Sequence, residues 1–225
     1  MNLKAAIYHF TDVSDKRPKI YMDELKNLEQ FAVSLGFTVT EIFCDKSLLR
    51  SNHPEFERFL ASCEKFDVLI TKDFYHISKN TMKCMYILKE LSNKGLKIFT
   101  MENGSFSWED IPLDKPLRVA TYNCHSPNIN NLEQVVKVQN DIFKLFSKKK
   151  TAWTVVKQYT DESEHQNNGD QVQLMNLINE KENYDLLLVH NLNNIHYRTT
   201  NFCKIRDQLQ LDIYSLQEGL IKYRR

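Results

Sequence analysis

The sequence predicts an α/β protein with two tandem three-layer domains, each a mostly parallel sheet of four or five strands flanked by helices. Apolar strand segments alternate with helical segments along the chain, which favours parallel pairing with helices on both faces of a sheet. A unit of strand, polar loop, helix and strand spans residues 66–108 and returns at 184–223. Within it, LKIFTMENGSFSW aligns with LDIYSLQEGLIKY position for position, Gly104 on Gly219.

Length and composition agree with this organisation. The 225 residues suffice for two domains of about a hundred residues each. With 30 basic and 29 acidic residues, the whole chain shows no electrostatic preference for nucleic acid or anionic membrane. The start, MNLKAAIYHFTD, is typical of a strand, and no window is apolar enough to span a bilayer. Five cysteines lack metal-ligand spacing, so we expect buried small side chains and a reduced, cytoplasmic setting.

The first repeat, 1–108, is expected to follow one order of elements. These are strand 3–10, loop 11–19, helix 20–35 ended by Gly36, strand 37–44, loop 45–52, a short helix opened by His53-Pro54, strand 66–70, a helix ended by Gly95, and strand 96–101. Helical periodicity assigns the apolar face of the first helix to Leu25, Leu28, Phe31, Ala32 and Leu35. The same spacing in the last helix selects Met82, Met85, Leu88 and Leu91.

The second repeat, 117–225, is expected to restate this order after a linker at 109–116 (EDIPLDKP) that has two prolines and no periodicity. Its elements are strand 117–122, a polar loop with Pro127, a helix ending in Lys148-Lys149-Lys150, strand 151–159, loop 161–170, helix 171–179 and the closing unit. Fold class is therefore the firmest inference that the sequence allows.

Each half resembles the catalytic domain of the serine recombinases, the resolvase/invertase family. The motifs that carry the resemblance occur in family order at nearly family spacing: Ala5-Ala6-Ile7-Tyr8, Leu35-Gly36-Phe37, Cys44-Asp45, His53-Pro54, Phe66-Asp67-Val68-Leu69 and Met101-Glu102. The ordered set carries the resemblance, since no single motif is specific.

The resemblance implies a site in which a serine hydroxyl attacks a DNA phosphodiester among several arginines. In the first half the family's nucleophile falls at Asp12 and its arginines at Phe10, His53, His76 and Lys79, with Tyr75 in place of an aspartate. In the second half the serine is kept as Ser126, and the arginine positions hold Cys124, Gln171, Asn194 and Tyr197.

Neither half combines a nucleophile with an arginine cluster. Planar bidentate donors stabilise the charge of a phosphoryl transition state, and losing one such partner costs about 2 to 4 kcal/mol. The sequence therefore leans against enzymatic activity, and no cofactor is expected. The long dimer-forming helix and the DNA-binding module that follow this domain in family members are not recognisable.

Several residues allow a second interpretation. Asp12, His53 and His76 could form a divalent-metal site, although drift at a solvated loop edge is favoured. Ser126 could be a live nucleophile assisted by His125 or Lys137, although a turn or cap serine before Pro127 is favoured. The run 148–150 is interpreted as a solvated helix end rather than a phosphate contact. Packing is favoured over base stacking for the aromatic residues Phe99, Phe106, Trp108, Tyr214 and Tyr223.

Three functional hypotheses remain open. The preferred one is a tandem, degenerate recombinase-like protein encoded near a mobile element. It would act in DNA recombination as an accessory or DNA-associated protein, with DNA or an active recombinase as partner. The alternatives are a non-catalytic regulatory or scaffold protein that binds another protein, and a small-ligand or metal-binding protein that uses the former cleft. Both a homodimer and an intramolecular pseudo-dimer are compatible with the repeat, and no membrane association is expected.

Overall fold

The computed structural model describes residues 3–12, 18–47, 53–106, 115–128, 131–149, 152–163 and 171–223. The chain divides into two compact units. The first comprises Met1–Ser78 with Tyr86–Ser107, and the second comprises Lys79–Met85 with Trp108–Arg225. The expected linker lies almost entirely outside the described residues, so the repeat boundaries at 108 and 117 remain a proposal.

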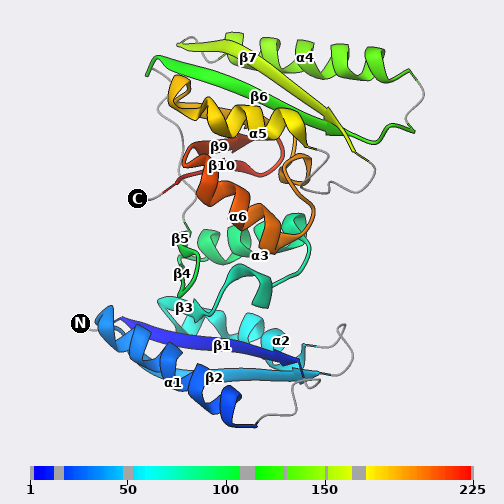
Figure 1. Ribbon diagram of the computed structural model, residues 1–225. Helices are drawn as coiled ribbons and strands as arrows, with labels where there is room; N and C mark the ends of the chain where they lie inside the picture. Colours follow the sequence, from blue (N-terminus) through cyan, green and yellow to red (C-terminus); the bar gives the residue numbers. More distant parts are fainter. Residues whose placement is uncertain are drawn as a thin grey trace. The chain divides into compact units, whose positions relative to one another are not determined.

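The first unit is built on a five-stranded sheet in the order β2-β1-β3-β4-β5 (Figure 1). All neighbouring strands pair in parallel except β5, which is antiparallel to β4. The strands are β1 (Lys4–Asp12), β2 (Thr38–Ser47), β3 (Val68–Thr71), β4 (Lys97–Thr100) and β5 (Gly104–Phe106). The helices are α1 (Pro18–Ser34), α2 (Pro54–Ser62) and α3 (Thr81–Asn93), of which α3 belongs to this unit from Tyr86 onward, with short 3-10 turns at Cys63–Lys65 and Phe74–His76.

The second unit repeats this topology, with strand order β7-β6-β8-β9-β10 and only β10 antiparallel. Its strands are β6 (Leu117–His125), β7 (Trp153–Glu162), β8 (Leu186–Val189), β9 (Asp212–Ser215) and β10 (Gly219–Ile221). Its helices are α4 (Leu132–Lys149), α5 (Val172–Asn179) and α6 (Thr199–Leu209), with 3-10 turns at Lys181–Asn183 and Leu192–Asn194. In Figure 1, α4 covers one face of β6 and β7, and α5 lies on the other.

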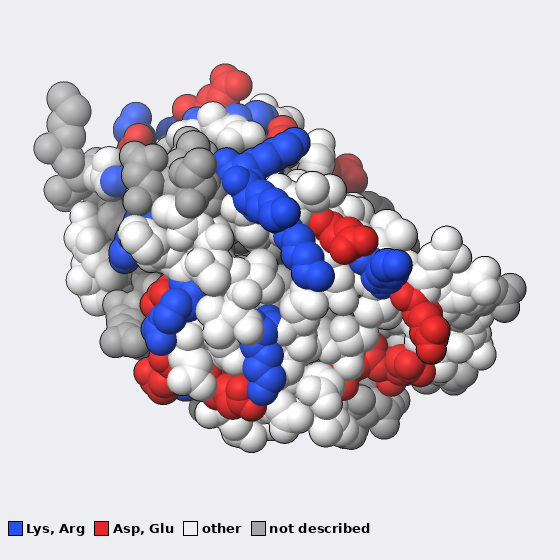
Figure 2. All heavy atoms as spheres, turned by 90° about the horizontal axis from the view of Figure 1, so that it is seen from above, with Lys and Arg blue, Asp and Glu red and all other residues white. Residues whose placement is uncertain are grey.

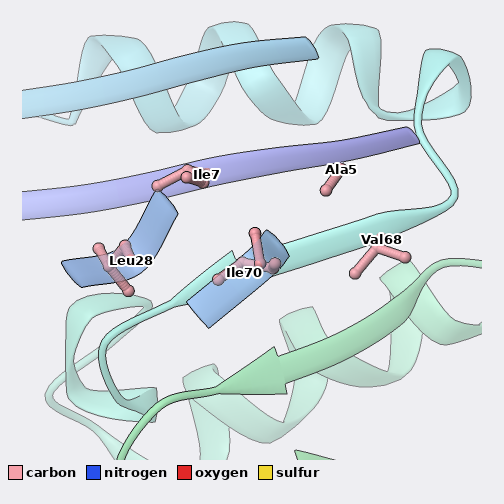
Figure 3. Close-up of a cluster of buried hydrophobic side chains, with 6 residues drawn as sticks. Ala5, Ile7, Leu28, Val68 and Ile70 are labelled. Atoms are coloured by element: carbon pink, nitrogen blue, oxygen red, sulfur yellow. The ribbon is translucent and has the colours of Figure 1, made fainter. Parts of the chain in front are cut away.

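The core of the first unit lies between its sheet and α1. Ala5 and Ile7 of β1 meet Val68 and Ile70 of β3 and Leu28 of α1, all fully buried (Figure 3). Every residue of β3 is buried because helices cover both faces of a central parallel strand, and this explains its continuous apolar sequence. The strand β8 of the second unit is buried in the same way.

The predicted fold class is confirmed: both units are mixed, mostly parallel α/β sheets flanked by helices. Gly36 and Gly95 follow α1 and α3 with φ of 78° and 88°, as expected for residues that end helices in the left-handed conformation. In the second unit Gln210 adopts the same conformation, with φ of 54°, after α6. The helical turn thus keeps its geometry without glycine.

Several expectations about elements were wrong. The segments beginning at Asp45 and Asp161 are not loops at first, because β2 and β7 continue to Ser47 and Glu162 by pairing with the extended ends of β1 and β6. Leu35 lies beyond the end of α1 and is 40% exposed, and Met82 in the first turn of α3 is 37% exposed. Helical periodicity identified the buried face of each helix, but it did not predict that residues at the helix ends are exposed.

Cysteines and aromatic residues behave as small and large core side chains. All five cysteines are free; four are buried, and Cys44 is half-buried. Phe99 packs on Phe37 with ring centroids 5.2 Å apart, and Tyr214 packs on Trp153 at 5.7 Å. The side chains of Phe106 and Trp108 lie outside the described residues. Among the helices that the structure describes, none is long and apolar enough to cross a membrane.

Candidate functional site

A buried tyrosine–aspartate pair anchors the carboxyl edge of the first sheet. The Tyr8 hydroxyl donates to Asp45 Oδ2 at 3.1 Å. The same carboxylate accepts the backbone N–H groups of Glu55 and Phe56, each at 3.0 Å, in the first turn of α2. Asp45 therefore satisfies two of the helix's unpaired N–H groups and lies at the positive end of its dipole. Burial, reinforced by the negative charge of Asp45, raises the pKa of Tyr8.

The second unit contains the same arrangement atom for atom. The Tyr122 hydroxyl donates to Asp161 Oδ2 at 3.1 Å, and Asp161 accepts the N–H groups of Gln173 and Leu174 at 2.9 Å each. Burial raises the pKa of Tyr122, and the neighbouring Cys124 and Asp161 raise it further. We call each set the tyrosine–aspartate lock: Tyr8 and Asp45 with the first turn of α2, and Tyr122 and Asp161 with that of α5.

The residue before each of these helices differs in exposure and in hydrogen bonding between the two units. In the first unit His53 is partly exposed, with its Nδ1 3.4 Å from the Tyr8 hydroxyl and 4.0 Å from Asp45 Oδ2. Its ring packs edge-on against Phe10, with centroids 5.1 Å apart. In the second unit Gln171 is buried, and its Nε2 donates to both the Tyr122 hydroxyl and the Ile195 carbonyl at 3.0 Å. An amide thus closes the second site.

A second imidazole lies after β3 in the first unit. His76 Nδ1 is 2.8 Å from Asp73 Oδ1, which also accepts the His76 backbone N–H at 3.0 Å. Burial raises the pKa of Asp73, but the hydrogen bonds and charge of His76 outweigh it, and the net pKa lies below the usual value. The side chain of His76 is therefore engaged by a carboxylate of its own turn.

Behind His76 lies His9, a fully buried histidine that sequence reasoning did not single out. The two rings stack with centroids 5.4 Å apart, and His9 Nε2 lies 3.1 Å from the Thr11 hydroxyl and 3.3 Å from Glu24 Oε2. Burial and, to a smaller extent, the neighbouring His76 lower the pKa of His9 to about 4, against the opposing charge of Glu24. The sequence did contain a signal for this site, because His9 is a polar residue within the largely apolar first strand.

The second unit replaces these imidazoles by amides. Asn194 and Asn191 exchange reciprocal side-chain to backbone hydrogen bonds at 3.1 and 3.2 Å. Asn194 Nδ2 also donates to the Cys124 carbonyl at 3.3 Å. Asn123, which pairs in β6 where His9 pairs in β1, is likewise fully buried. No titratable group remains at these three positions.

The remaining family-equivalent positions are dispersed. Lys79 is half-buried, and Tyr75 is half-buried with its ring edge-on to His76. Tyr197 is 37% exposed; its hydroxyl accepts from Arg198 Nε at 2.7 Å, and its ring stacks on His196. Cys124 is buried, which raises the pKa of its thiol.

The serine position in the second unit lies in a turn. Ser126 follows β6, and its hydroxyl accepts the Asn128 backbone N–H at 3.4 Å. The neighbouring His125 is buried, and burial lowers the pKa of its imidazole. Lys137 is exposed on α4. The geometry is that of a turn serine.

The metal hypothesis remains untested. Asp12 ends β1, but its side chain lies outside the described residues. His53 and His76 each approach a different carboxylate, Asp45 and Asp73. Among the described side chains no group of three or more histidine, cysteine, aspartate or glutamate residues is placed to hold a metal ion.

Comparisons with known proteins agree with this architecture. Residues 14–121 match the family model described as the resolvase N-terminal domain. The chain therefore contains a resolvase-like domain. No curated protein matches.

Solved structures similar to this chain include two recombinase domains and a sugar-binding protein. The catalytic domain of TP901-1 integrase is 12% identical, with 65% of this chain and 97% of that chain covered and a TM-score of 0.40. A resolvase family site-specific recombinase from Streptococcus pneumoniae is 8% identical, with 66% and 95% covered and a TM-score of 0.42. A glucose-galactose binding protein from Geobacillus stearothermophilus is 12% identical, with 97% and 80% covered and a TM-score of 0.33.

Proposed function

We propose that this protein acts in DNA recombination as an accessory, DNA-associated member of the recombinase-related proteins and does not itself cleave DNA. The observation that carries the proposal is the fate of the family's arginine positions. His53 and His76 lie beside carboxylates of their own unit, and Gln171 and Asn194 bond to groups of theirs. The scaffold that positioned a catalytic site is kept, while its cationic side chains are replaced.

Phosphoryl transfer explains why this replacement matters. Charge develops on the phosphoryl oxygens in the transition state, and catalysis depends on cations already aimed at them. A histidine and an aspartate that lie side by side have no net positive charge that could stabilise a phosphate. An amide that is hydrogen-bonded to the protein's own groups has no donor aimed at a phosphate. Each lost partner costs about 2 to 4 kcal/mol, so losing several brings the rate near background.

Ser126 provides the sharpest test of inactivity. We expect no covalent protein–DNA species after the full chain is incubated with sheared DNA from its source genome and run on a denaturing gel. Without an activating base or cation, the hydroxyl stays protonated and the leaving group gains no stabilisation. The Ser126→Ala variant should behave identically. A covalent band that disappears in that variant would contradict the proposal.

DNA association is tested by the salt dependence of binding. We expect reversible binding to the same DNA at about 50 mM salt and much weaker binding at about 200 mM, because bound lysines and arginines release counterions from the phosphates. Six contacts would give a slope of log affinity against log salt of about −5. The variant Lys148→Gln with Lys149→Gln probes the exposed last turn of α4. We expect its slope to be unchanged if these lysines only complement the helix dipole.

If the protein does not bind DNA at low salt, the proposed DNA role is wrong, and the alternative role of a scaffold that binds another protein is favoured. The proposed role requires access to chromosomal or plasmid DNA, and we therefore propose a cytoplasmic location and a gene near a mobile element. Both features follow from the function and stand or fall with it.

A further inference from the structure

A pocket of about 560 Å³ lies at the amino edge of the second sheet, where β6, β8 and β9 begin. Tyr122 and Asp161 of the tyrosine–aspartate lock lie toward the opposite ends of β6 and β7. The pocket is therefore separate from the site described above. The apolar part of its lining consists of four leucines and two tyrosines: Leu117, Leu186, Leu211, Leu220, Tyr184 and Tyr223.

Hydrogen bonds of the chain itself fix two walls of this pocket. Because β10 runs antiparallel to β9, the residues after β10 return to the edge where β9 begins. There the backbone N–H of Tyr223 donates to Asp212 Oδ1 at 2.8 Å. In the same way the backbone N–H of Arg118 donates to Asp185 Oδ2 at 2.8 Å and joins the start of β6 to that of β8. These walls are set before any ligand arrives, which lowers the cost of binding one.

The first unit shows that the fold does not require this lining. Its Lys4 N–H donates to Asp67 Oδ2 at 2.8 Å, so the bond between the first and third strands is kept. Three lining residues nevertheless differ in character from their counterparts in the aligned repeat: Leu220, Lys222 and Asp212 stand where the first repeat has Ser105, Ser107 and Lys97. The lining is thus particular to the second unit.

The charges around the pocket favour an anion. Lys115 and Lys222 line it together with Asp185 and Asp212. The guanidinium of Arg118 bonds to Asp185 through Nε at 3.1 Å and Nη2 at 3.0 Å. The hydrogen bonds of Arg118, opposed by burial and assisted by the charge of Lys115, hold the pKa of Asp185 below its usual range. Three cations therefore face two carboxylates, one of which already has a bidentate partner.

This preference is local to the pocket. The whole chain has 30 basic and 29 acidic residues. Figure 2 shows basic and acidic side chains on one face of the molecule with uncharged surface between them, so one sign of charge does not dominate the residues described there. An anion would therefore be attracted by the charges that line the pocket and not by a field of the whole protein.

We propose that this pocket binds a small organic carboxylate with an aromatic or branched apolar body. The body would pack on the leucines and against Tyr184 and Tyr223, where its burial supplies the affinity. The carboxylate would accept charge-assisted hydrogen bonds from Lys115 and Lys222. The volume falls within the range of small-molecule sites. The inference concerns the opposite edge of the sheet from the recombinase-like site and does not depend on the proposed DNA role.

Titration of phenylacetate into the isotope-labelled full chain, followed by backbone amide resonances, measures both affinity and location. We expect saturable shifts confined to residues 115–117, 184–186, 210–212 and 220–223. A ligand of about ten non-hydrogen atoms should give a dissociation constant of about 0.1 to 1 mM. No saturable shift up to about 10 mM phenylacetate, or saturable shifts elsewhere in the chain, would overturn the proposal.

The neutral analogue phenylacetamide tests the recognition of charge. It has nearly the same shape as phenylacetate but cannot accept a charge-assisted hydrogen bond from an ammonium group. We expect it to bind about fivefold more weakly or worse at the same residues. Equal affinity for the two compounds would show that the lysines do not recognise a carboxylate, and the proposal would then be wrong.

Two variants separate the roles of charge and apolar surface. Lys115→Gln with Lys222→Gln should weaken phenylacetate binding about fivefold and leave phenylacetamide binding unchanged. Tyr223→Ala, which keeps the backbone N–H that Asp212 accepts, should weaken the binding of both compounds. The control Lys204→Gln removes an exposed lysine of α6 that is not part of the described lining and should change neither. A double lysine variant that is folded by circular dichroism and binds phenylacetate as the wild type does contradicts the proposal.

Discussion

Replacing Asp161 by alanine is expected to lower the free energy of unfolding of the second unit by about 3 to 5 kcal/mol. The buried carboxylate accepts three hydrogen bonds, from Tyr122, Gln173 and Leu174, and its loss leaves all three donors without that acceptor. It also removes the negative charge at the N-terminus of α5. The effect should exceed that of an ordinary surface substitution severalfold.

Fluorescence of Trp153 measures this loss within the second unit. Trp153 is buried in the core beside Val119 and Phe143. The sequence has two tryptophans, so the substitution Trp108→Phe leaves Trp153 as the one tryptophan whose fluorescence is measured. Urea unfolding followed by this signal should shift to lower denaturant for Asp161→Ala, and by roughly half as much for Asp161→Asn, which keeps one oxygen acceptor. Asp45→Ala is the matched control, because it opens the equivalent lock in the first unit. A Trp153 transition unchanged by Asp161→Ala would show that the lock does not stabilise the unit.

Lowering the pH from about 6.5 to about 4 is expected to destabilise the first unit by about 2 to 3 kcal/mol through His9 alone. The folded pKa of His9 is about 4, below the ordinary 6.5, because burial disfavours the charged ring and His76 lies beside it. Between these values the unfolded chain binds a proton that the folded chain does not. Stability therefore rises with pH across this window and is complete above it.

Several charged or titratable groups surround His9 and can also change the stability as the pH falls. Glu24 approaches from α1, Lys72 and Asp73 from the segment after β3, and His76 from the following turn. The pKa of Asp73 is lowered, so its contribution is lost at lower pH than that of His9. Burial also lowers the pKa of His125 in the second unit, which makes the comparison with a variant essential.

Two variants isolate the contribution of His9. His9→Asn carries the residue found at the equivalent position of β6, and His9→Phe keeps a ring that can stack on His76. Both should flatten the loss of stability between pH 6.5 and 4 by about the same amount, although they will differ in stability at pH 7. Urea unfolding followed by circular dichroism at several pH values measures the slope. Variants that retain the wild-type slope would show that His9 is not the group that titrates.

The repeat shows how one scaffold can diverge at its site. Both units keep the tyrosine–aspartate lock, while one places histidines and the other amides around it. In each unit the lock accepts two backbone N–H groups in the first turn of a helix, whereas the side chains around it differ between the units.

Sequence by itself determined the fold class, the repeat and the order of elements. Alternation of strands and helices, and glycines at helix ends, are local signals with direct physical causes in backbone geometry and burial. The same reasoning predicted the family-equivalent positions one by one, and none of these positions holds an arginine.

Only the tertiary structure decided what those positions contact. That His76 is held by Asp73, that Gln171 closes the second site, and that His9 lies buried behind His76 depend on side chains brought together from separate strands and helices. The extension of β2 and β7 past Asp45 and Asp161 has the same origin, because polar residues stay in a strand when a neighbouring strand supplies their hydrogen bonds. Helical periodicity likewise could not separate the buried face of α4 from the apolar side chains that this helix exposes, since both satisfy the same spacing and only the position of the sheet distinguishes them.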